Sequence, residues 1–312
     1  MHEIALLFGG LIGLWLGTDR VVKSAVDIAR FYQLSELFIG LTILSVGTDL
    51  PELVISVYGA VQRLQGIETS GVIIGNAIGS SFSQISIVMG IAGLIGTLQL
   101  SRSRIKKDGF VLIGAIVLLA LTGIDGQISR LEGITLIVAY LVYYVQLVRK
   151  ERASERIIKE IDGKMAYNLV YLAAGLILVI FSSNLVVENA TLLAENWGVK
   201  QSFVGIVIVG LGTSLPELAI SLKAIMDKST GLSVGNLIGS NIFDTLIPIG
   251  VAGTISGLEI APSIVWFDLP ALFLLSAMVL YFFTHRTGLQ KMEALLLIFL
   301  YMVYGSLKMF GI

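Results

Sequence analysis

Long apolar stretches are the feature that most restricts how this chain can fold. Of its 312 residues, 55% are hydrophobic and 14% are charged, and the mean hydropathy is +0.89. Soluble domains carry about 25% charged residues, so this composition indicates a polytopic membrane protein. Apolar runs long enough to cross a bilayer, or interrupted pairs of shorter runs, predict ten membrane spans. They fall near residues 3–28, 37–61, 70–97, 109–125, 132–149, 167–194, 202–225, 231–256, 265–284 and 289–310.

The composition also excludes several kinds of chemistry. The chain has no cysteine and only two histidines, which excludes disulfides, zinc–thiolate centres and histidine-cluster metal sites. A net charge of −1 gives no indication of nucleic-acid binding. The sequence contains no recognisable nucleophile–base pair or phosphate-binding loop. We therefore expect a protein that is not an enzyme and that needs no cofactor.

The positive charges indicate how the predicted spans are oriented. With ten spans, 17 of the 21 Lys and Arg residues fall on one side of the membrane and four on the other. The positive-inside rule places the richer side in the cytoplasm and therefore both termini outside. We expect a multi-pass protein of the plasma or inner membrane that contacts lipid and inorganic cations and functions as a monomer.

The chain divides into two similar halves. Residues 1–150 are predicted to form a first repeat of five spans, residues 151–166 a charged cytoplasmic linker, and residues 167–312 a second repeat of five spans. Because each repeat has an odd number of spans, the second copy must enter the membrane upside down. Inverted repeats with interrupted helices around a midplane site are typical of secondary transporters. The predicted fold is an all-α membrane protein with helices two, three, seven and eight broken around such a site.

Each half carries the same motif in its second span. Gly-Thr-Asp-Leu-Pro-Glu occupies residues 47–52, and Gly-Thr-Ser-Leu-Pro-Glu occupies residues 212–217. Proline has no amide hydrogen, and its ring clashes with the carbonyl four residues earlier. Pro51 and Pro216 therefore predict breaks in the second and seventh helices.

These breaks would expose a set of oxygen atoms at membrane depth. Backbone carbonyls near Thr48 and Thr213 are freed, and Glu52 and Glu217 follow the break directly. Freed carbonyls are tolerated there only when they line a cavity or bind something. A charged group at mid-span costs roughly 2.5–3.5 kcal/mol on insertion scales, which indicates a functional role. An all-oxygen site suits hard cations such as Ca²⁺, which takes about six to eight oxygens, and Na⁺ accepts the same type of donor.

The third and eighth spans carry a second shared motif. Gly-Asn-Ala-Ile-Gly-Ser occupies residues 75–80, and Gly-Asn-Leu-Ile-Gly-Ser occupies residues 235–240. Glycines four residues apart permit close approach of helices. The serine that ends each motif can direct its oxygen toward the same centre, as can the polar residue one helical turn later. The candidate site residues from these two spans are Ser80, Ser240, Gln84 and Asp244.

Each of these signals also has a purely structural explanation. A Gly-x-x-x-Gly pattern alone usually reflects helix packing, and a single proline in a membrane helix more often produces a kink. One buried Glu can be a structural hydrogen-bonding group. The combination, repeated at matching positions in both halves, favours a binding site. Asp19, near the predicted cytoplasmic end of the first span, is expected to be only an interfacial charge.

At these motifs the sequence resembles the calcium/cation antiporter superfamily, and most closely its prokaryotic sodium/calcium exchangers. The resemblance covers essentially the whole chain. It implies an eight-helix core, two long tilted helices (spans one and six) that slide across it, and four neighbouring cation sites in a diamond. The implied calcium site consists of Glu52, Glu217 and the backbones of Thr48 and Thr213. The implied sodium sites consist of Ser80 with the first break, and of Ser214, Ser240 and Asp244.

Two positions depart from the pattern of that superfamily. Asp49 stands where the pattern has Ser, and Gln84 stands where Asn is expected. The site is then expected to contain four carboxylates, those of Asp49, Glu52, Glu217 and Asp244. Like charges this close in a low dielectric favour protonation. Our hypothesis is that Asp49 or Asp244 is protonated when Ca²⁺ is bound, so that H⁺ joins or replaces Na⁺ in the exchange.

The predicted function is secondary active antiport of Ca²⁺ against monovalent cations, with Na⁺ favoured over H⁺ or K⁺. A proton/calcium exchanger is the second interpretation. A passive cation channel belongs to a different class, because it would pass Ca²⁺ without an exchanging ion. A membrane scaffold would tolerate neutralisation of Glu52 and Glu217.

Overall fold

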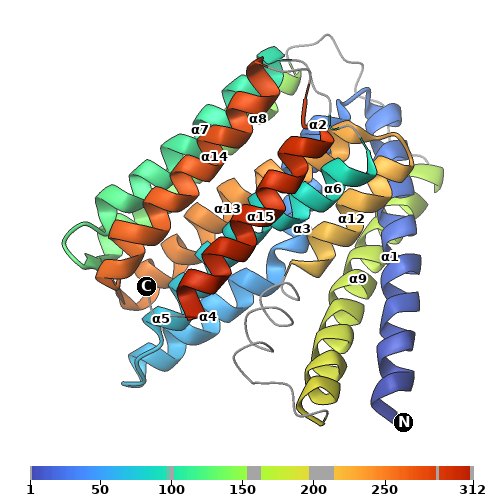
Figure 1. Cartoon of the computed structure of the whole chain (residues 1–312). Helices are drawn as coiled ribbons and strands as arrows, with labels where there is room; N and C mark the ends of the chain where they lie inside the picture. Colours follow the sequence, from blue (N-terminus) through green and yellow to red (C-terminus); the bar gives the residue numbers. More distant parts are fainter. Residues whose placement is uncertain are drawn as a thin grey trace.

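The computed structural model describes residues 2–96, 98, 102–152, 163–196, 214–285 and 288–309. These residues are almost entirely helical, and the predicted all-α fold is confirmed for them. The exception is a short antiparallel pair of strands, β1 (Gln127–Ile128) and β2 (Leu258–Glu259). Figure 1 shows the helices lying side by side in one bundle, with the N-terminus of the chain at the lower end.

The helices follow one another at the positions of the predicted spans. The first half contains α1 (His2–Tyr32), α2 (Glu36–Ile39), the π-helical η1 (Gly40–Leu44), α3 (Ser45–Thr48), α4 (Leu50–Leu64), α5 (Ser70–Ser83), the π-helical η2 (Gln84–Val88), α6 (Met89–Ile95), α7 (Arg102–Thr122) and α8 (Arg130–Arg152). The second half contains α9 (Gly163–Asn196), α12 (Leu215–Met226), α13 (Thr230–Ser256), the π-helical η4 (Ile264–Asp268), α14 (Leu269–His285) and α15 (Lys291–Met309).

The described helices identify a multi-span membrane protein. Six helical segments are long and apolar enough to cross a bilayer, and the bent pair Glu36–Thr48 and Leu50–Leu64 makes a seventh candidate. Each of the ten predicted ranges contains at least one described helix. The number of ten spans itself stays a prediction.

The break predicted in the second helix is present. Asp49 (φ −86°, ψ 6°) interrupts the helix between α3 and α4, and the two parts are bent by 44°. Pro51 lies in the first turn of α4, where its missing amide hydrogen is tolerated. In the second half, α12 begins in the same way: Ser214 (φ −95°, ψ 11°) precedes the helix, and Pro216 lies in its first turn. The residues just before Ser214 lie outside the described part of the chain.

The breaks predicted in the third and eighth helices are wrong. α13 is one continuous α-helix, and α5 continues through η2 into α6 as one candidate span. Glycine keeps its amide hydrogen, so it does not interrupt the hydrogen-bond ladder as proline does. Its role here is close packing: a Cβ on Gly235 would lie 2.5 Å from Leu37 O, and one on Gly239 would lie 2.8 Å from Ser45 Oγ. The irregularity in the third helix is instead a π-helical turn that begins at Gln84.

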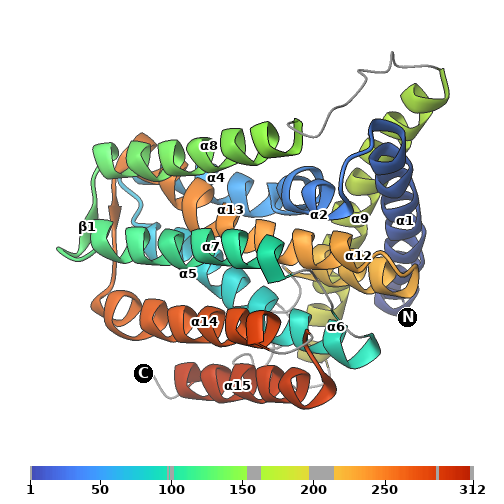
Figure 2. The same ribbon diagram turned by 90° about the horizontal axis from the view of Figure 1, so that it is seen from above.

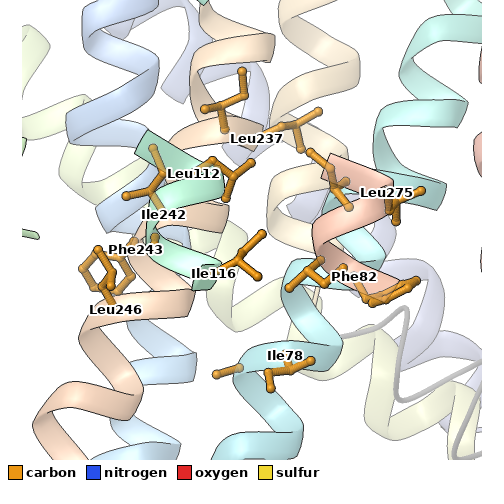
Figure 3. Close-up of a cluster of buried hydrophobic side chains, with 14 of the residues drawn as sticks. Ile78, Phe82, Leu112, Ile116, Leu237, Ile242, Phe243, Leu246 and Leu275 are labelled. Atoms are coloured by element: carbon orange, nitrogen blue, oxygen red, sulfur yellow. The ribbon is translucent and has the colours of Figure 1, made fainter. Parts of the chain in front are cut away.

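α13 lies at the centre of the bundle. Every residue from Leu232 to Gly250 is buried. It packs against α8, α4, η1 and α5, which belong to the first half of the chain. Figure 3 shows part of the surrounding core, which contains Ile78, Phe82, Leu112, Ile116, Leu237, Ile242, Phe243, Leu246 and Leu275.

α1 and α9 form a pair at one side of the bundle (Figures 1 and 2). They pack against each other more extensively than any other two elements. Small residues permit this approach: a Cβ on Gly17 would lie 3.2 Å from Gly175 O. A buried hydrophobic cluster of its own connects the pair to η1 and α12.

Candidate functional site

The predicted acidic residues come together inside the bundle, at the break between α3 and α4. Asp49 is the residue at the break, Glu52 lies in the first turn of α4, and Glu217 lies in the first turn of α12. Asp244 comes from the middle of α13. Asp49, Glu217 and Asp244 are completely buried, and Glu52 is 1% exposed. Neither half of the chain forms this cluster alone.

The four carboxylates are close enough to act on one another electrostatically. Asp49 lies within range of Glu52, Glu217 and Asp244, and Glu217 is also within range of the other two acids. None of them forms an ion pair with a Lys or Arg among the described residues. Their mutual repulsion in a low-dielectric interior therefore requires compensation by protons or by bound cations.

Most of the carboxylate oxygens have no hydrogen-bond partner within the described part of the chain. Six of the eight are unpartnered: both oxygens of Asp49, both of Glu217, Oε2 of Glu52 and Oδ1 of Asp244. A buried acceptor normally has at least one partner, and an unpaired buried charge is strongly unfavourable. These oxygens are therefore available as ligands.

Gln84 connects the two remaining carboxylate oxygens. Its Nε2 donates to Asp244 Oδ2 (3.1 Å) and to Ser80 Oγ (3.2 Å). Ser80 Oγ in turn donates to Glu52 Oε1 (3.3 Å). Gln84 Oε1 accepts a hydrogen bond from Asn241 Nδ2 (3.1 Å). Gln84 therefore turns its N–H groups toward the acids and acts here as a donor, whereas the sequence suggested a cation ligand.

Asn241 is a site residue that sequence reasoning missed. Its Nδ2 donates both to Gln84 Oε1 (3.1 Å) and to Leu237 O (2.9 Å), and this second bond fixes which way its amide faces. Asn241 directly follows the Gly-Asn-Leu-Ile-Gly-Ser motif, but its first-half counterpart is a serine. Because the residues after the two motifs differ, comparing the motifs does not identify Asn241.

Two buried serines were also missed. Ser56 and Ser221 lie four residues after Glu52 and Glu217, and both are completely buried. Neither hydroxyl has a hydrogen-bond partner among the residues that the structure describes. Residues four apart share one face of a helix, so this spacing could have identified them from the sequence.

The other predicted residues have different environments. Thr48 Oγ1 donates to the backbone oxygens of Leu44 (3.1 Å) and Ser45 (3.2 Å). Ser214 Oγ accepts from Ser83 Oγ (2.6 Å), which links α12 to α5. Ser240 is buried, and its hydroxyl is unpartnered within the described residues. Thr213 lies outside the described residues.

The acids are clustered without forming a closed metal cage in this conformation. Across the described ranges, no group of three or more His, Asp or Glu side chains is arranged to hold a metal ion. What the structure provides is a buried concentration of negative charge and free oxygens from both halves.

Asp19 does more than face the membrane interface. Its carboxylate binds Lys23 (2.8 Å) on the same helix and Lys223 (3.2 Å) on α12. Lys223 also binds Asp227 (2.7 Å). The four charges connect α1 to the core at one end of the bundle.

Known proteins are similar to this chain in sequence and in fold. The profile of the family described as "Sodium/calcium exchanger protein" matches residues 2–148 and 167–310. An uncharacterised membrane protein of Methanocaldococcus jannaschii is 32% identical over 311 residues, and the match covers 96% of each chain. The sodium/calcium exchanger MaX1 of Methanosarcina acetivorans is 25% identical over 341 residues, with 96% of each chain covered. A solved structure of the sodium-calcium exchanger NCX_Mj has a TM-score of 0.83 at 29% identity, with 97% of each chain covered. This chain therefore belongs to the sodium/calcium exchanger protein family, a family of transporters and not of enzymes.

Proposed function

We propose that the protein exchanges Ca²⁺ for monovalent cations, chiefly Na⁺, by alternating access. The observation that carries this proposal is the buried cluster of four carboxylates with six unpartnered oxygens. Carboxylate and hydroxyl oxygens suit Ca²⁺ and Na⁺ and offer nothing that would favour softer metals. The names of the relatives support the choice, since MaX1 and NCX_Mj are both called sodium/calcium exchangers.

In this proposal the residues have distinct roles. Glu52 and Glu217, with backbone oxygens near Thr48 and Thr213, hold Ca²⁺. The oxygens of Ser80, Ser214, Ser240 and Asp244 complete the positions for monovalent ions. Because both kinds of ion use the same carboxylates, their occupancy is mutually exclusive, and this exclusion couples the two fluxes. Bound cations also neutralise the acids, so the site changes access without exposing bare charge to an apolar surface.

Asp49 adds a reason to include H⁺ as a coupling ion. It contributes a fourth carboxylate, and a single Ca²⁺ leaves two of the four negative charges uncompensated. We propose that a proton on Asp49 or Asp244 supplies part of the missing positive charge. If H⁺ replaces Na⁺ entirely as the coupling ion, the protein is a proton/calcium exchanger, which is the second candidate function.

The proposed architecture is ten spans in two inverted repeats, residues 1–150 and 167–312, joined by the linker 151–166. The family profile matches in two segments that correspond to these halves, which supports the division. The basic ends of α1, α8 and α14 lie toward the upper end of Figure 1. By the positive-inside rule that end faces the cytoplasm and both termini lie outside. We propose that the protein is a monomer in the plasma or inner membrane.

A flux assay tests the proposed function. The purified protein is reconstituted into liposomes, and uptake of radioactive Ca²⁺ is measured with Na⁺, K⁺ and H⁺ gradients imposed in turn. We expect uptake only when an exchanging ion is present inside, with the largest rate for Na⁺. Uptake without any exchanging ion would identify a passive channel and contradict the proposal.

A further inference from the structure

A cavity lies on the outer surface between α7 and α14, and none of the four acids of the buried cluster lines it. It has a volume of about 450 Å³ and is lined chiefly by Lys106, Phe110, Leu280, Tyr281, Thr284 and His285. Figures 1 and 2 show these two helices packed side by side at the edge of the bundle. The cavity is at the end of the molecule where basic residues gather, since Lys106 and Lys107 lie in the second turn of α7 and Lys291 begins α15.

A missing side chain shapes this cavity. A Cβ on Gly109 would collide with the end of the Leu280 side chain, so glycine at position 109 leaves room for Leu280 where α7 and α14 meet. Phe110 and Tyr281 stand beside this contact and remain 57% and 52% exposed. The result is an apolar groove with aromatic walls that opens to the surroundings of the bundle.

The polar side chains that line the groove are those of Lys106, Thr284 and His285. Lys106 Nζ lies 6.0 Å from the centroid of the Phe110 ring and forms no ion pair with a described residue. The His285 ring stacks on Tyr281 with centroids 4.6 Å apart, and its Nδ1 lies 3.0 Å from Thr284 Oγ1. No acidic side chain lines the cavity as far as the structure describes it.

The nearest acid along the chain does not neutralise this charge. Asp108 is only 4% exposed and accepts a hydrogen bond from Tyr143 of α8 (3.5 Å). It therefore faces the interior of the bundle, whereas Lys106 and Phe110 face outward.

We propose that this cavity is a binding site for an anionic phospholipid. The lipid phosphate would lie at Lys106 and His285, and the first carbons of an acyl chain would lie along Phe110 and Leu280. Basic pockets between membrane helices at the cytoplasmic side are known to select anionic headgroups. Each basic residue near the membrane surface favours an anionic lipid over a zwitterionic one by about fivefold. The site is separate from the cation site, so it does not depend on the proposed exchange activity.

Quenching by brominated lipids tests this inference. Phe110→Trp places a fluorescent reporter in the cavity, and the signal of the three native tryptophans is subtracted using the protein without the reporter. The protein is reconstituted with phosphatidylcholine and increasing amounts of either brominated phosphatidylglycerol or brominated phosphatidylcholine. We expect the reporter protein to bind phosphatidylglycerol about fivefold more tightly than phosphatidylcholine. Equal quenching by the two lipids would overturn the proposal.

A matched pair of lysine variants completes the test. Lys106→Gln in the reporter protein should reduce the preference for phosphatidylglycerol to about one, whereas Lys107→Gln, at the neighbouring exposed lysine outside the cavity lining, should leave it unchanged. Equal losses in both variants would mean general surface attraction and would overturn the site. Displacement of the lipid by millimolar inorganic phosphate would indicate a site for the free ion and would also contradict the proposal.

Discussion

The two halves of the proposed cation site carry the same number of acids but place them differently. Each half has one glutamate of the motif, Glu52 or Glu217, and one further acid. In the first half this further acid is Asp49, at the helix break, and the third helix carries Gln84. In the second half the break carries Ser214, and the acid is Asp244 on α13. The partners differ as well, because Ser83 holds Ser214 and Gln84 holds Asp244, whereas both oxygens of Asp49 are unpartnered among the described residues.

The two halves of the proposed site are therefore equivalent in charge but not in how the charge is held. An amide donor from the first half stabilises the additional acid of the second half. No described side chain does the same for Asp49 in return. Asp49 and Glu217, whose carboxyl groups lie next to each other and whose oxygens accept no hydrogen bond from another described side chain, are therefore the acids that depend most on protons or cations for compensation.

The largest effect should come from removing the pair of acids that the halves share. Glu52→Gln and Glu217→Gln should each reduce Na⁺-driven Ca²⁺ uptake by at least about 100-fold, because each removes a charged ligand from an all-oxygen site. Losses of similar size would support equivalent roles. Glu259→Gln, which changes an exposed acid paired with Arg63, is the control. Normal uptake by both site variants would indicate a protein that does not transport through this cluster.

Asp49→Ser should have the next largest effect, because it makes the break of the first half identical to that of the second. Removing one of four carboxylates should weaken Ca²⁺ binding about tenfold and abolish any contribution of a H⁺ gradient to uptake. Uptake is measured with Na⁺ and H⁺ gradients imposed separately. Ser214→Ala, which removes a hydroxyl and no charge at the equivalent position of the other half, is measured beside it, and Glu259→Gln again serves as the control. If only Na⁺ drives uptake in the unmodified protein and Asp49→Ser changes nothing, the role assigned to protons is wrong.

A smaller effect should come from the hydrogen bond between Asn241 and Gln84. Asn241→Ala frees the Gln84 amide to rotate, which should shift the Na⁺ concentration for half-maximal exchange by about fivefold, the value of one buried hydrogen bond. In a Gln84→Met background the same substitution should have no further effect. Additive effects of the two substitutions on Na⁺ dependence would show that Asn241 does not act through Gln84.

The smallest effects should come from Ser56→Ala and Ser221→Ala, the symmetric pair one turn beyond the glutamates. If these hydroxyls contribute to cation binding, each substitution should weaken Ca²⁺ binding by about threefold, and the two losses should be alike. Ca²⁺ dependence of exchange and thermal unfolding are measured together. Unchanged Ca²⁺ binding with increased thermal stability would mean that the serines are only unsatisfied buried groups.

Much of the architecture could be predicted because its causes are local. Apolar run length places the helices, and the missing amide hydrogen of Pro51 leads to the observed break at Asp49. Both motifs also predicted that acids from the two halves would lie inside the bundle. The predicted breaks in the third and eighth helices are wrong because their glycine motifs contain no proline, and glycine keeps its hydrogen-bond donor.

The role of Gln84 could not be predicted from spacing. Spacing placed it on the face of the site, but whether its oxygen or its nitrogen faces the acids depends on Asn241, which is distant in sequence and lies on another helix. The environments of Ser83 and Ser214 likewise depend on contacts between halves. Side-chain orientation in a buried network is a property of the packed structure and not of one motif.

The burial of α13 limits which parts of the molecule can move. A helix enclosed on all sides cannot be displaced without opening voids along its whole length, and protein interiors resist such voids. We therefore expect α13, and Asp244 with it, to stay in place while other elements move. We propose that water and ions reach the acids through movement of the elements around α13, above all of the α1–α9 pair, which has a separate hydrophobic cluster and an exposed outer face.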